Sequence, residues 1–556
     1  MRIVAGFSLL PLLMAIPSPT ECQVQTPALA DAIRNRIEAG TTRGEWTAAG
    51  EEILAVRALP QVYTERGFSE IWTSGGRMTP GANRFLAYLR RADEEGLRPE
   101  DYHLQTIDSL RSTAHQLPGP ETRRQVDLEL LLSDAFLVFG SHLLQGRVNP
   151  VSINPEWLAN RRNADMSQVL SESAAEDGFV DALVALLPRQ PGYANLREAL
   201  SRLSDVADAG GWGLVPQGTT LREGDSDPRV RALRARLLAS GDFSPAADTA
   251  PEDQDLQLFD SPLAEAVRRF QTRHGLDPDG AVGSGTLEAL NVSAEDRVRQ
   301  LEVNLERWRW LPEDLGVRHI LVNIAGFSVS VVEGNAPVMQ MRAIVGRQYR
   351  QTPVFSSRMT YLVLSPFWHV PPTIAAVDKL PEIKKNPAYI ASQRMVLLDA
   401  STNQPVDVSS VDWDAMTGSG FNQRYRLRQD PGPNNALGDV KFMFPNPHNV
   451  YLHDTPSREL FARTERGFSS GCIRLERPLE LAEYLLRVDP RWSEEGIRAA
   501  VDRRVEATVT LPESIPVHIQ YWTAWVGEDG DLNFRRDLYM RDRLVHEALS
   551  APPPGT

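Results

Sequence analysis

The sequence lacks three features that would indicate other classes of protein. It has no run of about 18 or more apolar residues, which excludes a polytopic membrane protein. Its 59 Lys and Arg are outnumbered by 73 Asp and Glu, giving a net charge of −14, so the basic character of a nucleic-acid-binding protein is missing. Cysteine is nearly absent, because Cys22 and Cys472 are the only two.

The composition is that of ordinary globular domains. Apolar residues make up 42% of the chain and charged residues 24%, which excludes a largely disordered protein. The 556 residues are too many for one hydrophobic core. At about 150 residues per domain, we expect about three or four units.

The N-terminus has the pattern of an export signal. Arg2 precedes the apolar stretch 4–16, and a polar, proline-containing segment follows. We predict that residues 1–23 form a signal peptide. The exported protein then keeps only Cys472, which cannot form an intramolecular disulfide. Lipidation of Cys22 is an alternative, although Pro19-Thr20-Glu21 before it match such a site poorly.

Residues 30–215 are predicted to be helical. Leu, Val and Ala recur at three- and four-residue spacings, and proline and glycine separate the segments. No nucleophile, base and metal ligands cluster here, so we interpret the region as a scaffold or substrate-positioning domain. The predicted helices span residues 28–38, 49–58, 79–95, 123–144 and 179–187.

A compact unit follows at residues 225–292. Its two amphipathic helices are predicted around 230–237 and 263–270, the second with Ser261 as N-cap and Pro262 at its first position. The acidic segment 246–256 between them is expected to be an extended loop.

From His319 onward, apolar residues alternate with period two, which predicts a β-rich domain over 316–545. Asp529-Gly530 is a predicted hairpin turn. Residues 371–438 are broken by many prolines and glycines and are predicted to be an inserted lid. Residues 546–556 are predicted to be a frayed tail. Further predicted strands cover 320–324, 327–331, 359–364, 449–452, 505–511, 515–526 and 532–534.

The candidate chemistry centres on Cys472. His453 lies 19 residues before it and could accept the thiol proton. Ser470-Gly471 give the chain the freedom to turn and direct backbone N–H groups at an oxyanion. A carboxylate or a carbonyl must then orient the imidazole. These residues alone indicate a cysteine acyltransferase or hydrolase. Taken singly, each has a plainer interpretation: a structural histidine, a turn, a flexible loop and an inert buried cysteine.

The segment Ser469-Ser470-Gly471-Cys472-Ile473-Arg474, with His453 before it, resembles the catalytic signature of the L,D-transpeptidases (YkuD-type catalytic domain). Ser470 replaces the usual second histidine. The long, multi-domain branch of that family commonly has Ser-Ser-Gly-Cys here, and the segments 367–372, 431–438 and 441–446 also look like that branch.

The unit at 225–292 resembles the small three-helix peptidoglycan-binding domain. Residues 270–276 (Phe-Gln-Thr-Arg-His-Gly-Leu) and Asp279-Gly280 match its hallmark, as does the Thr286-Leu287 helix start. Ser284 stands where the family usually has proline. A generic helical hairpin is the alternative.

The two resemblances together imply a multi-domain α+β protein. It would have a helical scaffold, a peptidoglycan-binding domain and a β-rich, mixed-sheet, sandwich-like catalytic domain with a lid. They imply a periplasmic enzyme without metal or cofactor, whose partners are the stem peptides and glycan of peptidoglycan, not nucleic acid. We expect a monomer with no membrane-spanning segment after signal removal.

The family resemblance also implies roles for individual residues. Cys472 would be the nucleophile, His453 the base, and the carbonyl of Asp454 the group that orients His453. The N–H groups of Cys472 and Gly471 would form the oxyanion hole. Substrate binding would fall to Ser469, Ser470, Arg474 and Tyr451, the last also a possible helper at the oxyanion. The implied reaction attacks the bond between the third residue of a tetrapeptide stem and its terminal D-Ala, and transfers the acyl group to the side-chain amine of another stem in a 3→3 cross-link.

Three alternatives stay open. The same Cys–His pair could act as an L,D-carboxypeptidase or cross-link hydrolase. A zinc hydrolase could use His448, His453, Asp454 and His369, although no helical i, i+4 spacing presents them. A non-enzymatic wall-binding scaffold would need only residues 30–292.

Overall fold

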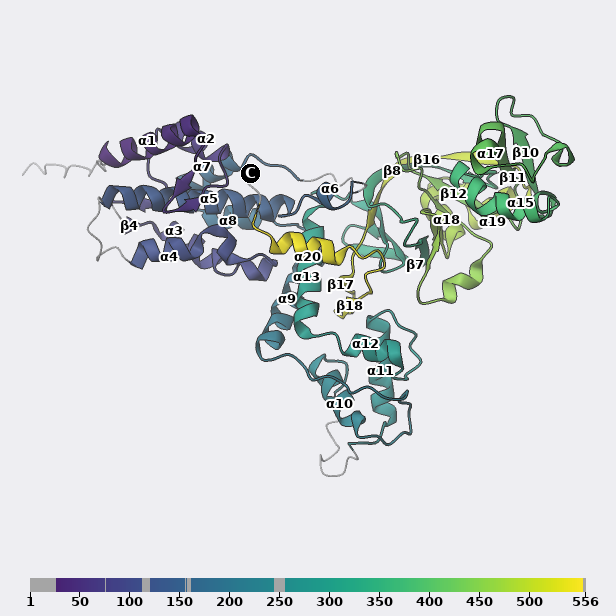
Figure 1. Cartoon of the computed structure of the whole chain (residues 1–556), viewed down its shortest axis with the longest axis horizontal. Helices are drawn as coiled ribbons and strands as arrows, with labels where there is room; N and C mark the ends of the chain where they lie inside the picture. The colour runs from purple at the N-terminus through teal and green to yellow at the C-terminus, as the bar shows by residue number, and fades with distance from the viewer. Residues whose placement is uncertain are drawn as a thin grey trace, which may run out of the picture.

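The computed structural model describes residues 27–75, 77–112, 121–155, 157, 162–244 and 256–553. The predicted signal peptide, Cys22 and nearly all of the predicted loop 246–256 lie outside the described residues. Figure 1 shows the helical N-terminal region at one end of the molecule and the β-rich region at the other, with a small helical unit below them. None of the described helices is long and apolar enough to cross a membrane.

The N-terminal region is built around one long, buried helix, α5. Shorter helices and two small hairpins surround it. The bounds are α1 (Pro27–Arg43), β1 (Thr47–Ala48), β2 (Glu51–Glu52), α2 (Ala58–Glu65), β3 (Thr73–Ser74), β4 (Arg77–Met78), α3 (Pro80–Leu89), α4 (Leu104–Ser112), α5 (Glu121–Gln145), α6 (Pro150–Ile153), α7 (Met166–Glu176), α8 (Phe179–Ala185) and α9 (Pro191–Asp208).

The predicted helix at 49–58 is wrong. β1 and β2 form a hairpin there, with Thr47 opposite Glu52, and α2 begins only at Ala58. Ala49 and Gly50 form the two-residue turn with φ of 50° and 89°. Positive φ at both turn positions matches the twist of a tight hairpin and cannot continue a helix.

A buried carboxylate ties α2 and the β3–β4 hairpin to α5. Glu129 is fully buried and accepts hydrogen bonds from the amides of Ile71, Trp72 and Thr73 and from the hydroxyl of Tyr63. Burial raises the pKa of Glu129, while these donors act in the opposite direction. The carboxylate therefore satisfies main-chain donors that would otherwise be buried without partners.

The unit at 225–292 folds as three helices around its own apolar core: α10 (Arg229–Ala239), α11 (Ser261–Arg273) and α12 (Ser284–Leu290). Asp260, rather than Ser261, is the N-cap of α11, because its side chain accepts from the Leu263 amide. The Gln271 side chain donates to Asp279 Oδ1, the Ala281 carbonyl and Thr286 Oγ1. These bonds give the recurring Gln, Asp and Thr of the sequence motif a structural role.

The C-terminal region contains a nine-stranded mixed sheet that closes on itself. Its order is β14-β7-β15-β13-β12-β8-β16-β5-β6, and β6 also pairs with β7. The bounds are β5 (Arg318–Asn323), β6 (Ser328–Glu333), β7 (Ala336–Gly346), β8 (Phe355–Leu364), β12 (Val440–Met443), β13 (Leu452–His453), β14 (Gly467–Ser469), β15 (Ile473–Leu475) and β16 (Ala507–Gln520).

The mixed α+β class is confirmed, and the sheet is a closed, barrel-like layer where the sequence suggested a sandwich. β7 makes the closure possible because it is long: its first residues pair with β6, Ala343 and Ile344 pair with β15, and its last two residues pair with β14. β16 runs through what the sequence predicted as two separate strands, and its ladder is irregular between Thr510 and Ile515, around Pro512. Two helices pack near the sheet, α18 (Pro478–Leu486) and α19 (Glu494–Asp502).

Residues 371–438 form a folded subdomain with its own apolar core rather than a simple flap. It lies at the far end of the C-terminal β-rich region from the N-terminal helices (Figure 1). A three-stranded sheet of order β10-β11-β9 runs through it. The bounds are β9 (Trp368–His369), α14 (Pro372–Ile374), α15 (Leu380–Lys385), α16 (Tyr389–Ser392), β10 (Met395–Asp399), α17 (Gly418–Arg424) and β11 (Tyr425–Gln429).

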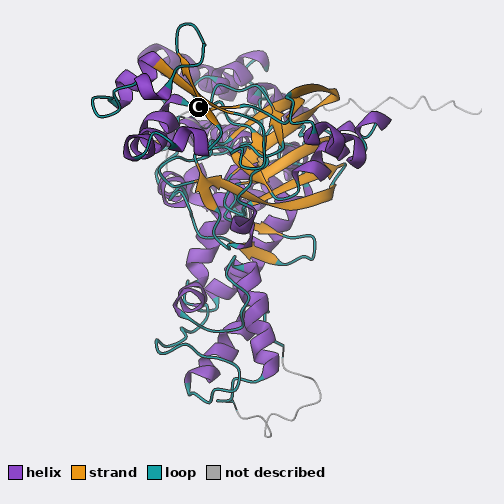
Figure 2. Ribbon diagram, turned by 90° about the vertical axis from the view of Figure 1, so that its right-hand side faces the viewer, coloured by secondary structure: helices purple, strands orange, loops and turns teal. Residues whose placement is uncertain are grey.

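Helices α13 (Ala294–Arg309) and α20 (Asp542–Ser550) join the three regions, together with the hairpin of β17 (Ala524–Val526) and β18 (Leu532–Phe534). Figure 2 shows α13 as part of the stem between the sheet and the small helical unit. The hairpin turn at Asp529-Gly530 is where the sequence placed it. The predicted frayed tail is wrong for 546–550, which continue α20: Val545 and Leu549 are buried, and Arg147 donates to the Leu549 carbonyl.

We predict that Glu129→Ala lowers the free energy of unfolding by about 3 kcal/mol, because three buried amides lose a charged acceptor. Thermal and urea unfolding of the full chain, followed by circular dichroism, measure the loss. Glu172→Ala on the exposed face of α7 is the matched control and should change stability by less than about 0.5 kcal/mol. Equal effects of the two substitutions would contradict a structural role for Glu129.

Candidate active site

Three neighbouring strands bring the predicted catalytic residues to one face of the sheet. In the strand register Lys441 of β12 is opposite His453 of β13, and His453 is opposite Arg474 of β15. Directly paired residues point to the same side of a sheet. Tyr451 and Cys472 each lie two residues before a member of this row, so they share its face.

The other face of the same strands anchors them in the core. Phe442, Leu452 and Ile473 are paired across β12, β13 and β15, and all three are fully buried. The alternation in Tyr451-Leu452-His453 and Cys472-Ile473-Arg474 therefore has a direct cause. The middle residue fills the core, and the flanking residues face the site.

His453 is held as a neutral imidazole. It is buried, and its Nδ1 lies 2.5 Å from the carbonyl oxygen of Asp454. Burial lowers the pKa of His453 to about 3, with the positive charges of Arg474 and Lys441 acting in the same direction. With the Nδ1 proton directed at that carbonyl, Nε2 carries the lone pair that a general base needs.

The carboxylate of Asp454 serves a different purpose. It accepts from the Asp439 amide at 2.9 Å and from Arg458 at 3.0 Å. The group that orients His453 is thus the main-chain carbonyl, while the side chain holds the turn after β13.

The thiol of Cys472 is half-buried beside Tyr451, and its Sγ donates to the Asn449 carbonyl at 4.0 Å. The Tyr451 carbonyl accepts from the Ile473 amide at 3.1 Å, which fixes Cys472 beside the Tyr451 ring. Burial raises the pKa of the Cys472 thiol, while hydrogen bonds with Tyr451 and the charges of Lys441 and Arg474 lower it. The described residues show no hydrogen bond between Cys472 and His453. Such contacts are often long in free enzymes and shorten in the substrate complex.

Two cations next to the thiol have no carboxylate partner within salt-bridge distance in the part of the chain that the structure describes. Lys441 places its Nζ 3.9 Å from the centre of the Tyr451 ring. Arg474 is half-buried, and its Nε has no hydrogen-bond partner. Burial lowers the pKa of both groups, and the nearby thiol counteracts it. The sequence prediction missed Lys441, although its alternation with Val440 and Phe442 was visible.

The turn before Cys472 depends on Gly471, whose φ is +116°. The Gly471 amide donates to Ser469 Oγ at 3.1 Å, and Ser469 Oγ donates to the Cys472 carbonyl at 2.5 Å. Thr352 Oγ1 donates to the Gly471 carbonyl at 2.8 Å. In this conformation the Gly471 amide is not available to an oxyanion, and the buried Ser469 supports the turn instead of facing a substrate. The roles expected for Gly471 at the oxyanion and for Ser469 in substrate binding stay predictions, and these bonds weigh against them.

Ser470 connects the turn before Cys472 to the inserted subdomain. Arg350 donates to Ser470 Oγ at 3.0 Å and forms an ion pair of 2.5 Å with Asp378. Asp378 lies between α14 and α15, within residues 371–438. Neither Arg350 nor Asp378 was found from the sequence, because they come together only through the tertiary fold.

The residues of the zinc alternative do not converge. Among the described residues, no three His, Cys, Asp or Glu side chains are grouped as metal ligands. His448 packs against the ring of Phe355 at 5.0 Å, and His369 is exposed on β9 of the inserted subdomain.

Comparison with known protein families identifies this region. Residues 317–506 match the family described as "L,D-transpeptidase catalytic domain". The chain contains an L,D-transpeptidase catalytic domain. Residues 226–290 match the "Putative peptidoglycan binding domain" family, and residues 57–200 match the family described as "Scaffold domain". The catalytic domain match includes both His453 and Cys472.

Relatives of known name agree with this assignment. A "Putative L,D-transpeptidase" from Haemophilus influenzae is 34% identical over 260 residues, covering 47% of this chain and 51% of the relative. An N-acetylmuramoyl-L-alanine amidase from Mycobacterium tuberculosis is 43% identical over 79 residues, covering 14% of this chain and 20% of that protein. The alignments thus span about half or less of these relatives.

Solved structures of L,D-transpeptidases were also matched, with low scores. One from Xylanimonas cellulosilytica is 15% identical and has a TM-score of 0.17, covering 55% of this chain and 98% of that chain. One from Mycobacterium smegmatis is 14% identical and has a TM-score of 0.15, covering 37% and 58%. These scores are too low to support a detailed comparison of the catalytic domain.

We predict that alkylation of Cys472 by iodoacetamide keeps rising with pH beyond the ordinary cysteine pKa of about 8.5, because burial raises the thiol pKa. Lys441→Met removes a positive charge beside the sulfur, so the profile should move to still higher pH. Mass spectrometry of the Cys472 peptide measures the rate.

Lys384→Met, on the exposed surface of α15, is the control and should leave this profile unchanged. A plateau of full reactivity at neutral pH would contradict a thiol that is protonated at rest.

Proposed function

We propose that the chain is an exported L,D-transpeptidase that joins two stem peptides of peptidoglycan in a 3→3 cross-link through a thioester on Cys472. The observation that carries this proposal is the shared sheet face of Cys472, Tyr451 and a neutral, oriented His453. Together with the peptidoglycan-binding match at 226–290, it supports a periplasmic enzyme that acts on wall material. That the enzyme is a monomer stays a prediction.

In the first half-reaction, His453 Nε2 takes the thiol proton while Cys472 Sγ attacks the carbonyl carbon of the third stem residue. The bond to the terminal D-Ala then breaks. His453 returns its proton to the departing amine, and D-Ala leaves with the acyl group held as a thioester.

In the second half-reaction, the side-chain amine of a diamino acid on another stem attacks the thioester. His453 accepts the proton of the amine, the C–S bond breaks, and the thiol is restored. The same neutral imidazole therefore serves both halves, which suits a group whose pKa of about 3 leaves it unprotonated at neutral pH.

The surrounding residues have complementary roles. The amide of Cys472 and the hydroxyl of Tyr451 are the donors that we assign to the oxyanion, since the Gly471 amide already bonds to Ser469. Arg474 and Lys441 form no ion pair with a carboxylate of the described residues, so they suit the carboxylates of the stem peptides.

Residues 371–438 are proposed to act as a lid that limits water at the thioester. Two contacts support this role: the Arg350–Asp378 ion pair beside Ser470, and the packing of Tyr451 against the core of the subdomain. A closed lid favours aminolysis because the amine arrives bound while water is excluded.

Purified protein incubated with tetrapeptide muropeptides should give dimers and free D-Ala, measured by liquid chromatography and mass spectrometry. Cys472→Ala should give neither product. His453→Ala should lower the rate by about 10²-fold to 10⁴-fold, because the base is lost. Tripeptide monomers in place of dimers would favour the carboxypeptidase alternative, and loss of activity on chelation would favour a metal hydrolase.

We predict that Asp378→Ala raises the ratio of tripeptide to dimer about threefold or more, because the lid loses its ion pair beside the nucleophile turn. Glu382→Ala removes a surface ion pair with Lys385 on α15 of the same subdomain and is the control. An unchanged ratio in Asp378→Ala would contradict the proposed role of the lid.

A further inference from the structure

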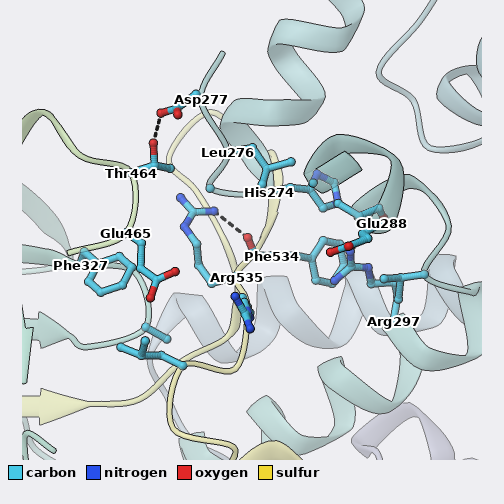
Figure 3. A pocket seen from close by; sticks show the side chains of 17 residues that line it. His274, Leu276, Asp277, Glu288, Arg297, Phe327, Thr464, Glu465, Phe534 and Arg535 are labelled. Atoms are coloured by element: carbon cyan, nitrogen blue, oxygen red, sulfur yellow. Dashed lines mark hydrogen bonds between the residues drawn. The ribbon is translucent and has the colours of Figure 1, made fainter. Parts of the chain in front are cut away.

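A cavity of about 450 Å³ lies where the peptidoglycan-binding unit meets the catalytic domain. Its walls come from the end of α11, from α12 and α13, from β18, and from the loop at 464–465. Figure 3 shows the side chains around it. The size is that of an ordinary ligand site.

Two arginines on its walls lack acidic partners in the described structure. Arg297 is buried; it donates to Gln300 Oε1 at 2.8 Å and to the Ala289 carbonyl at 3.3 Å, and its Nε has no partner. Arg535 is half-buried and donates only to main-chain carbonyls. A buried charge is costly unless an opposite charge compensates it. These walls therefore carry positive charge that no carboxylate among the described residues neutralises at salt-bridge distance.

The aromatic ring of Phe534 holds the wall in place. The Arg297 guanidinium lies 4.5 Å from the centre of the Phe534 ring. The His274 ring stacks on Phe534 at a centroid distance of 5.5 Å and on Phe270 at 3.8 Å. Burial lowers the pKa of Arg297 to about 9 and that of Arg535 to about 10. Both remain charged at neutral pH, so the site keeps its two cations.

His274 adds a neutral acceptor. Its Nδ1 lies 2.7 Å from the Phe270 carbonyl, so this nitrogen carries the proton. Burial lowers the pKa of His274 well below its usual range, and the charges of nearby arginines act in the same direction. Its Nε2 makes no hydrogen bond with the described residues and is left with a free lone pair.

The rim has the opposite charge. Glu288 of α12 and Glu465 of the loop before β14 line the cavity and are exposed, and neither forms a hydrogen bond or ion pair with the described residues. Asp277, beside them, is occupied by a hydrogen bond from Thr464. The cavity thus presents guanidinium donors on its walls and free carboxylates at its edge.

We propose that this cavity is a second binding site, which takes the part of a wall stem peptide that carries a carboxylate and a free ammonium group close together. The guanidiniums of Arg297 and Arg535 bind the carboxylate, since this pairing supplies charge-assisted hydrogen bonds. Glu288 and Glu465 accept from the ammonium group, and His274 Nε2 accepts a further donor. The stem-peptide assignment rests on the proposed function.

Binding is measured by isothermal titration calorimetry on full-length Cys472→Ala protein, which cannot turn the probes over. The first probe is a soluble disaccharide tetrapeptide whose diamino acid keeps its free amine and carboxylate. The second is the same compound with that carboxylate amidated, and the third is the disaccharide without peptide.

The first probe should bind at two sites. Arg474→Gln should abolish the site at the sheet face and leave the cavity site intact. The Glu288→Gln/Glu465→Gln double variant should weaken the cavity site about tenfold or more, and Arg297→Gln should weaken it at least as much. Arg299→Gln, on the exposed face of the same helix, is the matched control and should have no effect.

Replacement of the buried Arg297 could disturb α13. Glu288 and Glu465 are exposed, so the double variant at these two positions tests the proposal without that effect on folding. The amidated probe should bind the cavity about tenfold more weakly. The proposal is overturned if the rim variants bind the first probe as the parent does, or if the peptide-free disaccharide binds the cavity equally well. Failure of the proposed function would instead appear as an absence of dimers when the wild-type protein is incubated with tetrapeptide muropeptides. That measurement does not use the cavity variants.

Discussion

The site depends on the parallel pairing of two very short strands, β13 and β15. One main-chain hydrogen bond, from the Ile473 amide to the Tyr451 carbonyl, sets Cys472 beside Tyr451. A shift of one residue in this register would turn the thiol into the core and bring Ile473 to the surface. The fully buried Leu452 and Ile473 oppose that shift, so core packing is what keeps the nucleophile in the site.

On this face of the sheet, burial keeps the Cys472 thiol and the His453 imidazole neutral at rest. Lys441 and Arg474 form no ion pair with a carboxylate of the described residues. Burial dominates both shifts: it lowers the pKa of His453 and raises that of Cys472. The charges of Lys441 and Arg474 then stabilise any negative charge that develops on sulfur or arrives with a substrate. Because neither Cys472 nor His453 is ionised at rest, the proton would pass from the thiol to the imidazole during the reaction and not before it.

Local patterns in the sequence predicted much of this structure. Period-two alternation located β5, β6, β8 and β16 but not β7, β12, β14 or β15, and the Gln271 motif predicted the three-helix unit. The errors came where one residue changes the local geometry: the left-handed turn at Ala49-Gly50 replaced a predicted helix, and Asp260 rather than Ser261 caps α11. The C-terminal helix was missed because its burial depends on contacts with Arg147, some 400 residues earlier in the chain.

The motif that contains His453 and Cys472 could be predicted from the sequence, but the residues around it could not. Strand register brings Lys441 to the site, and the packing of the inserted subdomain brings Asp378 next to Arg350. The periodicity of a single sequence predicts neither the register nor this packing. The Ser469 hydroxyl and the Gly471 amide were assigned to the substrate because their types suited it. Their bond to one another is a property of the turn, visible only once the main chain is placed.

The mounting of the peptidoglycan-binding unit has a consequence for how the enzyme would survey the wall. Only three residues separate α12 from α13, and Asp277 bonds directly to Thr464, eight residues before the nucleophile. A module on a loose tether would let the thiol sample a wide volume around its anchor. Under the proposed function, the short connection and this side-chain bond would keep the thiol near one distance from the bound wall, so cross-linking would be confined to stems within that reach.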